Sequence, residues 1–152
     1  MYYAMLMQPH QVRWIEHNLI ANDIAFVVTG GVAVKFYHPA RETEDVDLFT
    51  GADPGSIDKM VASIPALAQN PKARAELLDR RVGHFKVGGE HRIDVLTFAP
   101  ALVFSEAFAT AEIANINGVD IPILSRALLI AHKTEAGDPK DLADVALLQQ
   151  SA

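Results

Sequence analysis

Three aspartates, Asp45, Asp47 and Asp94, are the residues whose types and spacing best suit chemistry. Asp45 and Asp47 flank a valine, and residues i and i+2 of a β-strand point to the same face of a sheet. Asp94 alternates with Ile93 and Val95 in the same way. Carboxylates that converge from neighbouring strands raise one another's pKa unless a cation lies between them. The cation that such a cluster predicts is magnesium, which takes oxygen ligands and leaves coordination positions for phosphates.

A glycine pair precedes the aspartates and ends an apolar run. Residues 24–29 read as a strand, Gly30 and Gly31 follow directly, and residues 32–37 look like a short helix. A lone Gly-Gly is usually a turn, and a lone Asp-x-Asp is usually a solvated strand edge. The order of glycine-ended strand, short helix, strand with paired aspartates and hairpin strand with a single aspartate favours a phosphate and metal site instead.

The other elements alternate along the chain. Strands are expected over 24–28, 46–50, 85–87, 92–98, 113–116 and 119–124, and helices over 8–20, 32–37, 56–63, 72–81, 125–136 and from 138 onward. Gly88-Gly89-Glu90 and Asn117-Gly118 predict two hairpins. The pattern indicates an α+β fold with α/β-like character, in which helices cover a mixed sheet and a helical pair ends the chain. We expect a single domain over 1–152, with a core at about 24–124 and C-terminal helices at about 125–150.

The composition excludes several classes of protein. The 152 residues suffice for one domain with a hydrophobic core, and the absence of cysteine excludes a disulfide scaffold, a thiol nucleophile and a cysteine-ligated zinc site. A formal net charge of −6 counts weakly against a large polyanionic substrate. The N-terminus lacks the pattern of a signal peptide, and no apolar run is long enough to span a membrane. These features predict a cytoplasmic protein with no membrane partner.

Several motifs together resemble the signature of the DNA polymerase β-like nucleotidyltransferase superfamily, namely Gly30-Gly31, Arg41, Thr43, Asp45-Val46-Asp47-Leu48 and Asp94. More narrowly, the chain is similar to minimal bacterial nucleotidyltransferases related to the abortive-infection toxins of type IV toxin–antitoxin systems. In that subgroup, a lysine on one helix and a Lys-Asp pair on the next helix follow the core. The residues that match this tail are Lys133, Lys140-Asp141 and Asp144. The resemblance covers about residues 24–148, and Gly31 stands where relatives often have serine.

The resemblance implies transfer of a nucleoside monophosphate from a nucleoside triphosphate to a hydroxyl acceptor, with release of pyrophosphate. Two magnesium ions would be held by Asp45, Asp47 and Asp94, and Asp94 would also help to deprotonate the acceptor. The glycines would let the backbone approach the triphosphate. The nucleotide-binding residues that the resemblance implies are Gly30, Gly31, Arg41, Thr43, Lys133 and Lys140.

Simpler interpretations stand beside these roles. A helical lysine such as Lys133 is usually solvated, and Arg41 could pair with Glu42 or Glu44. A modest basic cluster is more often a soluble surface than a landing site for an acidic partner; it consists of Lys72, Arg74, Arg80 and Arg81.

Two functional classes therefore remain open. The first is an active metal-dependent enzyme whose acceptor is a protein, a tRNA or a small molecule. The second is a catalytically inactive nucleotide-binding, regulatory or toxin–antitoxin interaction module on the same fold. In either class, a homodimer or a partner protein could complete the site.

Overall fold

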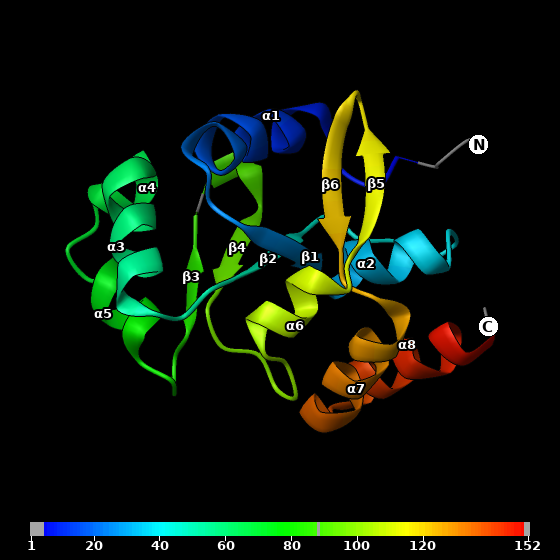
Figure 1. Ribbon diagram of the computed structural model, residues 1–152. Helices are drawn as coiled ribbons and strands as arrows, with labels where there is room; N and C mark the ends of the chain where they lie inside the picture. The colour runs from blue at the N-terminus through cyan, green and yellow to red at the C-terminus, as the bar shows by residue number, and fades with distance from the viewer. Residues whose placement is uncertain (1–4, 88, 151–152) are drawn as a thin grey trace.

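A six-stranded mixed sheet organises the chain in the computed structural model, which describes residues 5–87 and 89–150 (Figure 1). The strand order is β3-β4-β2-β1-β6-β5. The strands are β1 (Phe26–Thr29), β2 (Val46–Thr50), β3 (His84–Lys86), β4 (Ile93–Leu96), β5 (Glu112–Ile116) and β6 (Val119–Ile123). The predicted fold class, a mixed sheet covered by helices, is confirmed.

Strand alternation places the polar residues of the central strands on one face. Val46 and Leu48 of β2 are fully buried, whereas Asp47 between them is only partly buried. β2 runs antiparallel to β1 and parallel to β4. Because the side chains of a strand alternate between the two faces of the sheet, burial of the apolar residues on one face turns the aspartates to the other.

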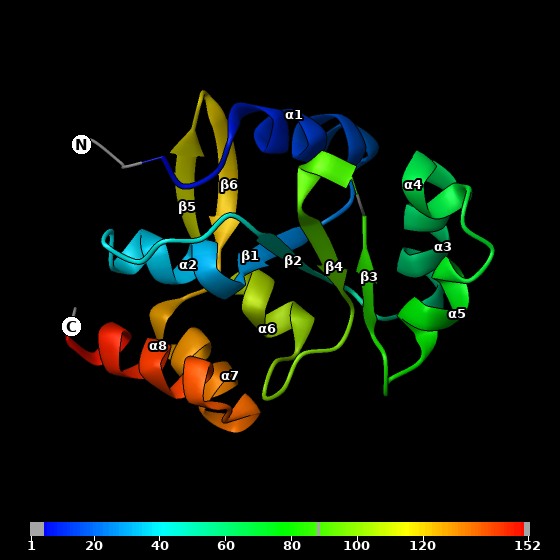
Figure 2. The same ribbon diagram turned by 180° about the vertical axis from the view of Figure 1, so that it is seen from behind.

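Helices lie on both sides of the sheet. In both views, α1 (Pro9–Asn18) lies above it and α6 (Phe104–Ala109) lies below it, beside α7 and α8 (Figures 1 and 2). The α3–α5 group stands beside β3. The remaining helical elements are α2 (Gly30–Tyr37), α3 (Pro54–Ser63), α4 (Pro65–Ala68), α5 (Ala73–Leu78), α7 (Arg126–Ala136) and α8 (Pro139–Gln150), with short 3-10 turns at Ile20–Asn22 and Gly89–His91. The predicted C-terminal helical pair is confirmed, since α7 packs directly against α8.

Two helices differ from the predictions in their boundaries, and in one of them a different residue caps the N-terminus. The expected helix at 56–63 begins at Pro54, because Asp53 accepts a hydrogen bond from the Ser56 amide and proline suits the first helical turn. The helix expected over 72–81 is confined to α5. The helices expected from 125 and from 138 begin as predicted, since the side chains of Ser125 and Asp138 each accept a backbone amide hydrogen bond at the helix start.

Both predicted hairpins are confirmed as antiparallel strand pairs. Asn117 and Gly118 have φ values of 52° and 83°, as a tight turn between β5 and β6 requires. β3 and β4 also pair, through a longer connection that includes a 3-10 turn. Residue 88, which belongs to the glycine turn predicted there, lies outside the described residues, as do 1–4 and 151–152. Within the described part of the chain, no helix has both the length and the hydropathy to cross a bilayer.

Candidate active site

Asp47 and Asp94 lie directly opposite each other at the centre of the sheet. They are partners in the parallel ladder of β2 and β4, so their side chains project from the same face, as predicted. Burial, followed by repulsion from Asp94 and from Asp45, raises the pKa of Asp47 from 3.8 to about 6. The site therefore holds closely spaced carboxylates that a cation would stabilise.

Asp45 contacts an arginine and not the Asp47–Asp94 pair. It precedes β2, its side chain is 57% exposed, and its Oδ1 lies 2.8 Å from Nε of Arg92. The same guanidinium lies 2.6 Å from a carboxylate oxygen of Glu44. Among the described residues, no group of three or more histidines, aspartates or glutamates is close enough together to hold a metal ion. The predicted convergence is thus observed for two of the three aspartates, because the third is drawn to an arginine.

The donor set suits magnesium at Asp47 and Asp94. Both supply hard carboxylate oxygens, and the Asp47 carboxylate accepts no hydrogen bond within the described part of the chain. Beside it, Thr29 is 2% exposed and its hydroxyl oxygen has no hydrogen-bond partner there. Thr29 is the β1 partner of Asp47 in the ladder, so both side chains project from the same face. A bound cation with its water ligands would satisfy both residues, and the metal roles of the three aspartates stay predictions.

The two glycines allow the start of α2 to approach these carboxylates. Gly30 has φ +65°, and a Cβ atom on it would lie 2.0 Å from Oδ2 of Asp47. A Cβ atom on Gly31 would lie 2.6 Å from Oγ1 of Thr43. The start of α2 can therefore lie this close to Asp47 and to Thr43 in the loop before β2 only because residues 30 and 31 have no side chains. The amides at the start of α2 lie at the same place, where a phosphate could accept their hydrogen bonds.

Arg41 is tied to the C-terminal helices. Its Nε and Nη2 atoms lie 2.9 and 3.1 Å from the two carboxylate oxygens of Asp144 on α8. The simpler interpretation, a side-chain ion pair with Glu42 or Glu44, is wrong, although Arg41 also donates to the backbone carbonyl of Glu42. Arg41 thereby connects the loop before the aspartates to α8.

Lys133 is buried in the same network and is not a solvated helix residue. It is 6% exposed, and its Nζ lies 2.9 Å from Asp144 and 3.4 Å from Asp141. Burial disfavours ionised Asp144, but hydrogen bonds from Arg41 and Lys133 outweigh it and hold the pKa of this carboxyl below its usual range. The charge of Lys133 also acts to lower the pKa of Asp47, so this amine stabilises the ionised form of the central carboxylate.

Lys140 is not part of this network, whereas Asp144 is. Lys140 is exposed on α8 and forms no ion pair with the described residues. Asp144 carries the network, although sequence analysis gave it no role. His84 was overlooked as well, and its Nε2 lies 3.5 Å from Oδ2 of Asp94. Strand alternation could have indicated His84, since Lys86 is the ladder partner of Asp94 and His84 lies two residues away on the same face.

Known proteins resemble this chain in sequence and in structure. The model of the family described as "Nucleotidyl transferase AbiEii toxin, Type IV TA system" matches residues 18–152. The chain belongs to the AbiEii family. A nucleotidyltransferase-like antigenic protein from Paracoccidioides brasiliensis has a similar structure, with a TM-score of 0.56 and 19% identity over 97% of this chain and 77% of that one. A search of the curated proteins found no match.

These findings confirm the resemblance and the fold. Membership of the AbiEii family makes the chain nucleotidyltransferase-like and links it to type IV toxin–antitoxin systems. The structural neighbour supports the fold alone at this level of identity. The chemistry of the individual residues rests on the geometry described above.

Proposed function

We propose that this AbiEii-family protein is an active magnesium-dependent nucleotidyltransferase. The observation that carries the proposal is the placement of Asp47 directly opposite Asp94, beside the glycine-started helix α2. Two magnesium ions, bound by these carboxylates with Asp45, would stabilise the attacking and leaving oxygens. Asp45 would have to exchange Arg92 for the metal to take part.

The reaction transfers one group and releases another. The acceptor hydroxyl oxygen forms a bond to the α-phosphorus of the nucleoside triphosphate, the bond from that phosphorus to the α,β-bridging oxygen breaks, and pyrophosphate leaves. The hydroxyl proton passes to the Asp94 carboxylate. The amides at Gly30 and Gly31 receive the phosphates, while the charge of Lys133 acts to lower the pKa of Asp47 against the larger effects of burial and the neighbouring aspartates. Arg41, through its hydrogen bond to Asp144, and Thr43 hold the loop that lies beside Gly31 at the start of α2.

The biological setting follows from the family. A toxin of a type IV toxin–antitoxin system implies a matching antitoxin, and we propose that the transfer reaction takes place in the cytoplasm, where nucleoside triphosphates and magnesium are abundant. The acceptor is a protein, an RNA or a small molecule carrying a hydroxyl group. A homodimer or another protein could bring further acceptor contacts.

Incubation with cell extract tests the proposal. Each nucleoside triphosphate, labelled at the α-phosphate, is mixed with the protein, magnesium and extract, and the label is followed into protein, RNA and small-molecule fractions. We expect label in one fraction, none with EDTA, and none with Asp94→Asn. Absence of transfer from all four nucleotides would contradict the proposal.

A non-catalytic nucleotide-binding module is the second candidate. The Asp45–Arg92 ion pair favours it, because it keeps one carboxylate of the predicted triad engaged elsewhere. This candidate predicts that magnesium and a nucleoside triphosphate raise the melting temperature while no label moves.

A further inference from the structure

The catalytic face of the sheet carries one row of residues that gives the site a direction. Thr29, Asp47, Asp94 and Lys86 are successive ladder partners across β1, β2, β4 and β3, so their side chains project from the same face. The glycine-started helix α2 directly follows β1, at one end of this row. Lys86 on β3 lies at the other end.

The residues proposed to bind the nucleotide lie at the α2 end of this row. The start of α2 lies beside Thr43 and Arg41, and α2 contacts β1, β2 and α7, the helix that carries Lys133. In-line displacement requires the attacking hydroxyl and the leaving pyrophosphate to lie on opposite sides of the α-phosphorus. The attacking group must therefore approach from the β3 side of Asp94.

The β3 side offers a strip of nitrogen-bearing side chains that the proposed reaction has not used. His84 and Lys86 share the face of Asp94, and the imidazole Nε2 lies 3.5 Å from the Asp94 carboxylate. Farther along, the guanidinium of Arg80 lies over the ring of Phe98, 5.5 Å from its centroid. We call Lys86, His84 and Arg80 the β3 strip.

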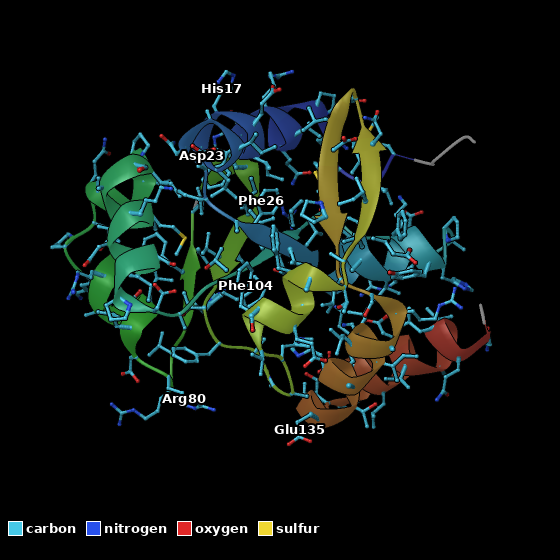
Figure 3. The ribbon with its side chains drawn as sticks, viewed as in Figure 1. His17, Asp23, Phe26, Arg80, Phe104 and Glu135 are labelled. Carbon is cyan, nitrogen blue, oxygen red and sulfur yellow. The ribbon has the colours of Figure 1, made fainter. Side chains whose placement is uncertain are left out.

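A hollow of about 950 Å³ has Arg80 of the strip in its lining, but not His84 or Lys86. Its lining includes Arg80, Phe98, Phe104 and Phe49, the last of which lies on the catalytic face two residues after Asp47. Arg80 lies at the lower end of the molecule and Phe104 on α6 (Figure 3). This space is large enough for a ligand of small-molecule size, and its lining residue Phe49 lies two residues after Asp47 on β2.

The positive charges of the β3 strip indicate the charge of the ligand that it would bind. Neither Lys86 nor Arg80 forms an ion pair with the described residues, although the chain carries a formal net charge of −6. Of the basic residues grouped in the sequence, Arg74 is paired with Asp58 and Arg81 with Asp79, and of the remaining two, Lys72 and Arg80, only Arg80 lines the hollow. Two cations without an ion-pair partner among the described residues, Arg80 in the hollow and Lys86 opposite Asp94, favour an anionic ligand on this side of the sheet.

We propose that the β3 strip is the acceptor subsite and that the acceptor carries a phosphate group near its reactive hydroxyl. The proposal rests on the proposed function. The hydroxyl lies at Asp94 beside His84, and the positive charges of both Lys86 and Arg80 attract the phosphate. The nucleotide and the acceptor thus occupy opposite ends of the same row.

Binding of a matched pair of probes tests the subsite without requiring transfer. Ribose 5-phosphate and ribose differ only in the phosphate, and a non-hydrolysable nucleoside triphosphate with magnesium fills the nucleotide side. We expect ribose 5-phosphate to bind at least about tenfold more tightly than ribose. Lys86→Gln and Arg80→Gln should each weaken it about fivefold, which corresponds to about 1 kcal/mol. The control Lys72→Gln, an exposed lysine at the start of α5, should leave it unchanged.

The outcomes separate this inference from the proposed function. Equal binding of the two sugars, or equal weakening by Lys72→Gln, would overturn the subsite. Phosphate-selective binding that depends on Lys86 and Arg80 would support it even if no nucleotide were transferred, in which case the proposed function alone would fail. A dinucleotide run alongside tells whether the phosphate belongs to a small molecule or to a nucleic-acid end.

Discussion

At the scale of single residues, Asp47 is the point on which the site depends. Burial of its carboxylate and the charges of Asp94 and Asp45 disfavour the ionised form. The charges of His84 and Lys133 favour it. The net effect raises the pKa of Asp47 to about 6. The fold therefore holds this group in a state that destabilises the metal-free protein once the carboxyl is ionised.

The first prediction concerns the pH dependence of stability with EDTA present. A carboxyl whose pKa is raised on folding contributes stability below its unfolded pKa, and this contribution is lost as the pH rises through the folded value. Asp47→Asn should therefore be more stable than the wild type at pH 8, by roughly 3 kcal/mol for a pKa raised from 3.8 to about 6, and equally stable near pH 4. Urea unfolding across this range measures the difference, and a difference independent of pH would refute the electrostatic explanation.

The second prediction concerns Gly30. Both Gly30 and Gly89 have positive φ, +65° and +62°, but a Cβ on Gly30 would collide with Asp47 whereas no described atom lies within 4 Å of one on Gly89. Gly89→Ala should cost only the backbone strain, about 1–2 kcal/mol. Gly30→Ala should cost more, about 3 kcal/mol, and should abolish the melting shift caused by magnesium with a nucleoside triphosphate. Equal thermal stability of the two variants would show that the close approach at Asp47 is unimportant.

At the scale of elements, one aspartate ties three segments together. Asp144 on α8 receives Arg41 from the loop before β2 and Lys133 from α7. The residues that α8 buries are Asp144 and Leu148, while the apolar Leu142 is 49% exposed. Helical periodicity places these residues but does not reveal that a carboxylate will be buried among cations.

Removing the Asp144 charge should therefore loosen the C-terminal helices. Asp144→Asn leaves two mostly buried cations without their partner, and we expect a loss of about 3–5 kcal/mol. Asp141→Asn, which removes a weaker contact at 3.4 Å, should cost less than about 1 kcal/mol. Because the pKa of Asp144 lies below its usual range, the difference should be present at neutral pH and shrink in acid. Similar melting temperatures for the two variants at neutral pH would contradict the network.

The elements most accurately predicted from sequence are those fixed by local chemistry. Alternation identified β2 and β4 because one face of each is buried, and Asn117-Gly118 identified the turn before β6 because both residues tolerate positive φ. The short helices α4 and α6 were not predicted, since four and six residues are too few for a helical period to register.

At the scale of the whole molecule, the strand order creates the site. Asp47 and Asp94 are far apart in the sequence and become neighbours because β2 and β4 pair in parallel. The period of two predicted that they would share a face, but not the arginine that draws Asp45 aside or the contact between His84 and Asp94. Those depend on tertiary contacts between segments that no local pattern encodes.

The rate of pyrophosphate release tests the central claim most directly. The wild type, Asp47→Asn and Asp94→Asn are compared with magnesium, each nucleoside triphosphate and cell extract as the source of acceptor, with Asp58→Asn as a control outside the site. We expect release by the wild type and the control, and a loss of at least about 100-fold in both site variants, a barrier increase of about 2.7 kcal/mol. Release by folded Asp47→Asn or Asp94→Asn at the wild-type rate would contradict the assignment of these two carboxylates to the reaction.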